Sequence, residues 1–185
     1  LGYSYESGIP YGVGFIKNRY IGRTFIQPTQ EEREAALRIK LNAMREAIDG
    51  KRVVMVDDSI VRGTQLRETT EFLYQSGAKE VHIRPACPPL VYGCKYLNFS
   101  RSKSEMELIT RRVIKKLEGI EGDEIPADIL AQYAASDTEK HEAMAEEIRQ
   151  ILKFDSLKFQ KLEDTVEAIG VDRCNLCTYC WDGKE

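Results

Sequence analysis

The chain has 185 residues, and its 27 lysine and arginine residues against 30 aspartate and glutamate residues give a formal net charge of −3. Its hydrophobic fraction of 42% excludes a disordered chain. No stretch reaches the about 20 apolar residues that cross a bilayer, and the nearly balanced charge argues against a dedicated nucleic-acid binder. We therefore expect a globular domain with neither a membrane nor a nucleic acid as partner.

The N-terminal fifty residues predict a strand, a loop and a helix. The chain begins with Leu1 rather than methionine, which indicates a piece of a longer protein. Residues 13–16 suggest a short strand, and the polar, basic residues 17–27 indicate a loop. Thr29 and Glu32 fit a capping box. Apolar residues on one helical face follow it, up to a natural stop at Gly50: Leu37, Leu41, Met44 and Ile48.

A βαβ unit follows. Residues 53–56 form an unbroken apolar run, which is typical of a strand covered on both faces. Residues 64–76 predict a helix ended by Gly77, and residues 81–85 predict a second strand. Two strands joined by a helix at this spacing are parallel, with a right-handed crossover. The predicted fold class is therefore α/β.

The second half of the chain is mainly helical. Residues 104–117 and 138–152 predict charged amphipathic helices, and residues 157–159 a short strand. A last helix is predicted over residues 161–169, ended by Gly170.

The segment between the first strand of the βαβ unit and its helix carries the candidate binding residues: Asp57, Asp58, Ser59, Ile60, Val61, Arg62, Gly63 and Thr64. A loop that opens a helix presents unpaired N–H groups and the positive end of the helix dipole, which suit a phosphate. Two adjacent carboxylates suit sugar hydroxyls or a divalent cation. The pattern therefore predicts a phosphorylated sugar at the carboxyl end of a strand.

An ordinary strand-to-helix turn capped by Asp or Ser is the alternative interpretation of this segment. The chain has neither the G-x-x-x-x-G-K-S/T pattern of a Walker A loop nor a G-x-G-x-x-G after a strand. A nucleoside triphosphatase and a dinucleotide-binding domain are therefore not indicated.

The five cysteines are unevenly placed. Cys174, Cys177 and Cys180 form a C-x2-C-x2-C run near the end of the chain, whereas a disulfide framework is usually spread through a smaller secreted chain. The bunching favours thiolate ligands of a metal or an iron–sulfur cluster in a cytoplasmic protein. Free thiols are the alternative.

Residues 53–64 closely resemble the phosphoribosyl pyrophosphate (PRPP) binding signature of the type I phosphoribosyltransferases. Residues 14–26 are similar to the flexible catalytic loop of one family among them, the glutamine PRPP amidotransferases (amidophosphoribosyltransferases), which open de novo purine synthesis. The resemblance extends over most of residues 10–110 and 145–185, through further matching stretches: Arg33, residues 40–42, 102–105, 108–109 and 147–151. It implies an open parallel sheet of the type I phosphoribosyltransferase kind, flanked by helices, with C-terminal helical segments.

The resemblance implies roles for individual residues. Asp57 and Asp58 would bind the ribose hydroxyls and the Mg²⁺ that accompanies pyrophosphate, and residues 59–64 would hold the 5-phosphate. Positive charge stabilises a departing pyrophosphate, and the flexible loop supplies the implied catalytic residues: Lys17, Arg19, Tyr20 and Arg23. Ammonia from a glutaminase domain would attack PRPP and give 5-phosphoribosylamine. Purine nucleotides as feedback inhibitors and a homo-oligomer are also implied.

The cysteines gain a role from the same resemblance. Cys177 and Cys180 match two ligands in the iron–sulfur members of the family, and Cys94 matches a third, which implies a 4Fe–4S cluster in the complete protein. The fourth ligand of the family lies upstream of the matched residues; Cys174 is a candidate substitute, and zinc is the competing occupant. Cys87 matches no ligand position and is interpreted as a small core residue.

Some family features have no match. Nothing resembles the glutaminase domain or the early strands of the phosphoribosyltransferase part, and residues 95–99 depart from the family's Tyr-Gly-Ile-Asp. We expect a phosphoribosyltransferase core at residues 1–110 without its N-terminal strands, a helical insertion at 111–145, and C-terminal helices with the cysteine-rich tail at 146–185. Whether this stretch is active alone is left open.

Two other functions stay open. A non-catalytic module that senses PRPP or a nucleotide can use the same phosphate loop, and an iron–sulfur or zinc interaction protein can retain that loop without using it. The basic loop at residues 17–23 favours the enzyme, because a binder has no need to stabilise a departing pyrophosphate.

Overall fold

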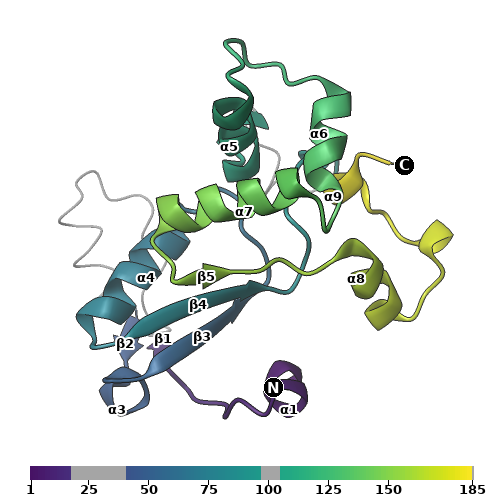
Figure 1. The fold of residues 1–185 in the computed structure, drawn as a ribbon. Helices are drawn as coiled ribbons and strands as arrows, with labels where there is room; N and C mark the ends of the chain where they lie inside the picture. The colour runs from purple at the N-terminus through teal and green to yellow at the C-terminus, as the bar shows by residue number, and fades with distance from the viewer. Residues whose placement is uncertain (18–40, 97–104, 185) are drawn as a thin grey trace. The chain divides into compact units, whose positions relative to one another are not determined.

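The computed structural model describes residues 1–17, 41–96 and 105–184 (Figure 1). The chain divides into two compact units. Unit 1 comprises residues 1–53 and 71–80, and unit 2 comprises residues 54–70 and 81–185. Among the described residues, no helix combines the length and the apolar character that a bilayer crossing requires.

Unit 1 contains a small antiparallel sheet. The unit begins with α1 (Gly2–Ser7), a helix that was not predicted. The chain then continues to β1 (Phe15–Lys17), which confirms the predicted N-terminal strand. β1 pairs with β2 (Leu41–Ala43), with Lys17 opposite Leu41. The prediction of a helix through Leu41 and Met44 is therefore wrong, because pairing with a distant strand holds this segment extended.

Little of that predicted helix lies within the described residues. Residues 18–40, which include the predicted loop and the proposed capping box, fall outside them. The end of the predicted helix corresponds to the short α3 (Arg45–Ile48), in which Ile48 is buried.

The βαβ prediction is confirmed. β3 (Arg52–Asp57) leads through a loop to α4 (Thr64–Gln75) and then to β4 (Glu80–Pro85). The sheet has the order β3–β4–β5, and β5 (Ser156–Leu157) runs parallel to β4 with Ile83 opposite Leu157. β4 alternates between buried and half-buried residues, which is the pattern of a strand with unequal faces. The carboxyl ends of β3 and β4 bear the candidate site.

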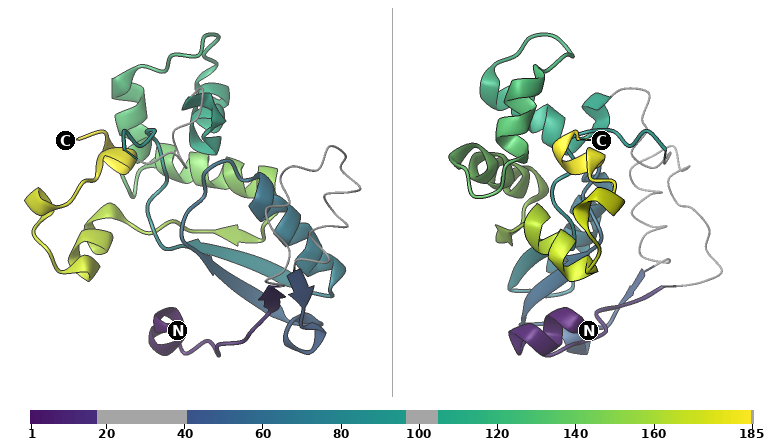
Figure 2. Two further views of the ribbon diagram at one scale, coloured as in Figure 1. Left: turned by 180° about the vertical axis from the view of Figure 1, so that it is seen from behind. Right: turned by 90° about the vertical axis from the view of Figure 1, so that its right-hand side faces the viewer.

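Three helices of unit 2 pack together: α5 (Ile109–Glu118), α6 (Ala127–Ala134) and α7 (Glu139–Leu152) (Figure 2). The helix predicted from residue 104 begins instead as the 3-10 turn η2 (Glu105–Glu107), and α5 starts after Leu108. The helix predicted from Thr138 is confirmed, since the Thr138 side chain accepts a hydrogen bond from the His141 N–H and caps α7.

The C-terminal segment follows the sheet. α8 (Leu162–Ile169) ends at Gly170 in the left-handed conformation, as predicted. η3 (Arg173–Asn175) and α9 (Tyr179–Asp182) carry the cysteine-rich tail. The backbone N–H groups of Val91 and Tyr92 both donate to the Cys180 carbonyl, at 2.9 and 3.0 Å, so the tail is held against the segment that follows β4.

Candidate functional site

The loop between β3 and α4, residues 58–63, approaches its neighbours closely at Gly63. This residue has φ +78°, and a Cβ atom there would lie 2.8 Å from Leu152 Cδ2 and 2.9 Å from Ile109 Cδ1. A side chain at position 63 would therefore clash with α7 and α5 and strain the backbone. Glycine therefore lets the loop approach these two helices closely.

The Asp58 N–H is paired with the Asp57 side chain, but the N–H groups that follow it in the loop have no partner in the described part of the chain. Within the described residues, none of the N–H groups of residues 59–64 donates a hydrogen bond. The last of these residues, Thr64, opens α4, a helix of 12 residues whose first N–H groups and positive dipole end face the same loop. Unpaired donors at a helix N-terminus form an anion site, and a phosphate matches it.

Two carboxylates stand beside this loop. Asp57 ends β3, its Oδ1 accepts the Asp58 N–H at 3.0 Å, and Asp58 Oδ1 accepts the Ser59 hydroxyl at 2.8 Å. Burial raises the pKa of Asp57 above its ordinary value, the hydrogen bond from Asp58 opposes this rise, and the like charge of Asp58 adds to it. A cation or hydroxyl donors would relieve that repulsion.

The donor set suits Mg²⁺ by its chemistry. Mg²⁺ is usually held by one or two carboxylates together with phosphate oxygens of a substrate, and Asp57 and Asp58 both reach solvent, even though the Asp57 carboxylate is desolvated enough to raise its pKa. The described residues contain no group of three or more His, Cys, Asp or Glu side chains arranged as a complete metal site. Further ligands would therefore have to come from the substrate and water.

Most of the predicted catalytic loop lies outside the described residues. Lys17 is the last residue of β1. Arg19, Tyr20 and Arg23 lie outside the described residues. The roles of these four residues consequently remain predictions.

A second feature of unit 2 is a cavity of about 310 Å³ that collects four of the five thiols. Its lining is mainly apolar: Ser59, Cys87, Leu90, Cys94, Tyr96, Cys177, Cys180 and Trp181. The three predicted cluster ligands thus share one cavity. Burial raises the pKa of Cys180 to about 12, and the neighbouring thiols of Cys94 and Cys177 add to this shift.

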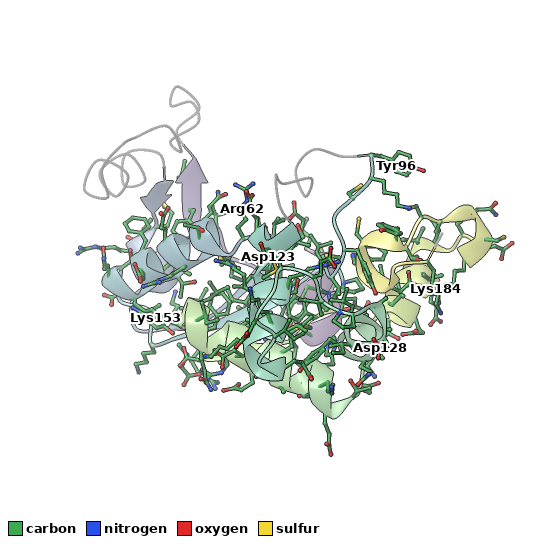
Figure 3. The ribbon with its side chains drawn as sticks, turned by 90° about the horizontal axis from the view of Figure 1, so that it is seen from above. Arg62, Tyr96, Asp123, Asp128, Lys153 and Lys184 are labelled. Atoms are coloured by element: carbon green, nitrogen blue, oxygen red, sulfur yellow. The ribbon has the colours of Figure 1, made fainter. Side chains whose placement is uncertain are left out.

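Cys174 lies on a different cavity. That cavity, of about 360 Å³, is lined by Cys174 and Cys177 with Lys95, Tyr96 and Tyr179 among others (Tyr96 is labelled in Figure 3). Cys177 therefore borders both cavities, and Cys174 borders only the second.

The interpretation of Cys87 as a core residue is wrong. Cys87 is half-buried on the thiol cavity, beside Trp181, and burial raises the pKa of its thiol to about 11. The reason is the position of Cys87 in the sheet. Asp58 comes directly after β3 and Cys87 comes two residues after the end of β4, and the Ala86 N–H donates to the Asp57 carbonyl at 2.8 Å. The carboxyl ends of neighbouring parallel strands meet at one edge of a sheet, a signal that was available in the sequence.

The comparisons with known proteins agree with one another and point to one family. No family model matches the chain. It is 43% identical over 183 residues to the amidophosphoribosyltransferase of Methanothermobacter thermautotrophicus, covering 99% of this chain and 32% of that protein. It is 39% identical over 194 residues to the amidophosphoribosyltransferase of Bacillus subtilis, covering 100% of this chain and 33% of that protein. The chain is a homologue of the amidophosphoribosyltransferases.

Solved structures support this relation to the amidophosphoribosyltransferases. The glutamine PRPP amidotransferase of B. subtilis, complexed with ADP and GMP, matches with a TM-score of 0.71 and 39% identity over 99% of this chain and 34% of that chain. A structure described as the allosteric regulatory enzyme of purine biosynthesis matches with a TM-score of 0.70 and 38% identity, over 99% of this chain and 33% of that one.

The predicted family and fold class are therefore confirmed. The amidophosphoribosyltransferase homologue has an α/β fold of the type I phosphoribosyltransferase kind, with a parallel sheet flanked by helices. The chain spans about a third of the length of the curated relatives that it matches.

Proposed function

We propose that this chain is the phosphoribosyltransferase part of an amidophosphoribosyltransferase. The complete protein would convert PRPP and glutamine-derived ammonia to 5-phosphoribosylamine and pyrophosphate, the first step of de novo purine synthesis. The observation that supports this most is the row of N–H groups at residues 59–64, which have no hydrogen-bond partner among the described residues and lie beside Asp57 and Asp58. It offers a phosphate site and a sugar site next to each other.

The proposed mechanism assigns a task to each group. The N–H groups of residues 59–64 and the Thr64 hydroxyl hold the 5-phosphate, while Asp57 and Asp58 accept hydrogen bonds from the ribose hydroxyls. These two carboxylates would also hold Mg²⁺, which when bound supplies positive charge toward the pyrophosphate. The nitrogen of ammonia forms a bond to C1 as the bond from C1 to the pyrophosphate oxygen breaks, and the nitrogen then loses a proton.

The leaving group needs further positive charge. We assign this task to the predicted catalytic residues Lys17, Arg19, Tyr20 and Arg23, since pyrophosphate departs with negative charge that cationic side chains and hydroxyl donors stabilise. A loop that closes over PRPP also keeps water from the reactive sugar. Ammonia would come from a glutaminase domain in the part of the relatives that this chain does not span.

We further propose that Cys94, Cys177 and Cys180 are ligands of a 4Fe–4S cluster. These three residues line one cavity, although among the described residues they do not form a ready group of three metal ligands, and cluster ligands are typically cysteine thiolates. Cys174 is the candidate fourth ligand within this chain, although it borders the neighbouring cavity. Zinc is the alternative occupant.

The remaining proposals concern partners and domain limits. Purine nucleotides as feedback inhibitors are supported by the B. subtilis structure, which is complexed with ADP and GMP. We also propose a cytoplasmic homo-oligomer, a core at residues 1–110, a helical insertion at 111–145, and a C-terminal part at 146–185.

The test uses the full-length protein with PRPP, Mg²⁺ and ammonium, and measures pyrophosphate release together with phosphoribosylamine. The double variant of Asp57→Asn and Asp58→Asn should lose this activity. Asp123→Asn is a matched control, because Asp123 is an exposed carboxylate paired with Lys115 on the helical part of unit 2 (Figure 3). Full activity of the double variant would refute the assigned site. Tight PRPP binding by the wild type without turnover would favour the sensing module instead.

A further inference from the structure

The first turn of α5 contacts two successive carbonyl groups of the phosphate loop. The Ile109 N–H donates to the Val61 carbonyl at 2.9 Å, and the Arg112 Nη2 donates to the Arg62 carbonyl at 2.8 Å. In addition, the Glu107 carboxylate forms an ion pair with the Arg62 guanidinium. Residues 107–112 therefore hold the loop backbone at Val61 and Arg62, and they also hold the Arg62 side chain.

These contacts determine where the loop donors point. In a planar trans peptide the C=O and the following N–H point in opposite directions, and the described residues contain no cis peptide bond. Because the carbonyls of Val61 and Arg62 point toward α5, the N–H groups of Arg62 and Gly63 point away from it. Two successive N–H groups with a shared direction form a concave anion site.

The contact from Arg112 has a second effect. Its guanidinium is charged, and a charged donor on the Arg62 carbonyl polarises the peptide group and strengthens the N–H at its other end as a donor. Arg112 itself is exposed on the helix surface, so its side chain contributes little to the core. The adjacent Arg111 differs, since it is buried and donates to the Val91 carbonyl.

We propose that Arg112, assisted by Glu107, is a positioning residue for the 5-phosphate of the substrate. It acts through the peptide between Arg62 and Gly63, whose N–H it orients and polarises toward the phosphate. The inference rests on the proposed function, because it takes PRPP as the ligand. It goes beyond the residues of the binding signature, because α5 lies outside that signature.

The test measures binding of the ribose 5-phosphate end and of the pyrophosphate end of the substrate separately. In the full-length protein, the Kd of ribose 5-phosphate and the Kd of pyrophosphate with Mg²⁺ are measured for the wild type and for Arg112→Ala. We expect the Kd of ribose 5-phosphate and the KM for PRPP to rise about tenfold, which corresponds to ~1.4 kcal/mol. The Kd of pyrophosphate should stay unchanged, and Arg112→Lys should restore part of the loss.

A control excludes a general effect on the helix. Lys116→Ala removes a charge one turn further along α5, from a side chain that pairs with Glu147 of α7; it should change neither Kd. Thermal unfolding should be unaltered by Arg112→Ala. An unchanged Kd for ribose 5-phosphate, or an equal rise for pyrophosphate, would overturn the inference while the proposed function stands. A wild type that binds no ribose 5-phosphate would overturn both.

Discussion

Leu152 of α7 lies against Gly63 of the phosphate loop, with its Cδ2 atom 2.8 Å from the position that a Cβ of residue 63 would take. Leu152 is almost completely buried, so it has little room to move. The loop therefore packs against a helix that lies far from it in the sequence, and a side chain at this position would have to displace the Leu152 side chain.

Gly63→Ala should therefore destabilise unit 2 and weaken binding of ribose 5-phosphate. The positive φ alone costs about 1–2 kcal/mol for a residue with a Cβ, and the clash with Leu152 adds to this. Urea unfolding measures the total. Gly119→Ala is the matched control, because Gly119 has φ +64° but no atom within 4 Å of its Cβ position. Equal losses of stability in the two variants would show that the contact with Leu152 is immaterial.

Asp57→Asn should abolish PRPP binding without lowering the stability of the ligand-free protein. Because burial raises the pKa of Asp57, the folded state binds more protons than the unfolded state between the ordinary and the raised value. Stability therefore falls as pH rises through that window and stays lower above it. Asparagine removes this loss, so the ligand-free variant should be at least as stable as the wild type at neutral pH, while PRPP binding is lost.

Urea unfolding at several pH values, compared between Asp57→Asn and the wild type, measures this effect. The difference in stability between the two proteins should grow in favour of the variant as pH rises from the acid range. A difference that does not change with pH would contradict the assigned shift of Asp57.

The phenol of Tyr133 should ionise at a higher pH than that of an ordinary tyrosine. Its phenol is buried and donates to Glu118 Oε1 at 2.8 Å, and burial followed by Glu118 raises the pKa of Tyr133 from 10.0 to about 12. Between these values the folded state keeps a proton that the unfolded state loses, so stability falls as pH rises through this range. Ultraviolet absorbance of tyrosinate measures the titration. Tyr133→Phe should remove the step near pH 12 from this titration, and a wild-type titration without such a step would contradict the prediction.

Cysteine substitutions should distinguish the ligands within the thiol cavity. Cys180→Ser should lower the iron and sulfide bound per chain and the visible absorbance of the anaerobically purified protein. Cys87→Ser should not, although Cys87 lines the same cavity, because it lies outside the proposed ligand set. Loss of the cluster in Cys87→Ser would contradict that set, and a colourless protein that contains zinc would exclude the cluster altogether.

The sequence predicts the elements whose signals are local. The strand at β3, the helix at α4 and the cap at Thr138 depend on apolar runs, glycine stops and hydrogen bonds within one turn. β2 was missed because Leu41 and Met44 continue a helical spacing, whereas the ladder to β1 that holds Leu41 extended joins segments far apart in the chain. A pairing of this kind leaves no trace in a short window of sequence.

The same distinction applies to the site. Residues 57–64 are contiguous, so the phosphate loop could be recognised from their order. The contact from Arg112 to the Arg62 carbonyl spans 50 positions, and the meeting of Cys87 with Cys180 depends on strand order and on the path of the tail. Such contacts arise from packing, and the residue types of Arg112 and Cys87 do not indicate them; only the position of Cys87 shortly after a predicted strand indicates that it lies at the edge of the sheet that carries the site.

The Cys180 carbonyl, which accepts two N–H groups, has a consequence for the order in which the protein folds. Its carbonyl receives the N–H groups of Val91 and Tyr92, and a connection between such distant segments closes late during folding, because loop closure costs entropy before any contact repays it. Before that closure, this contact does not hold Cys180 near the segment that leads to Cys94. For the proposed ligand set, this order means that a cluster would be bound only after the tail has closed onto the segment that follows β4.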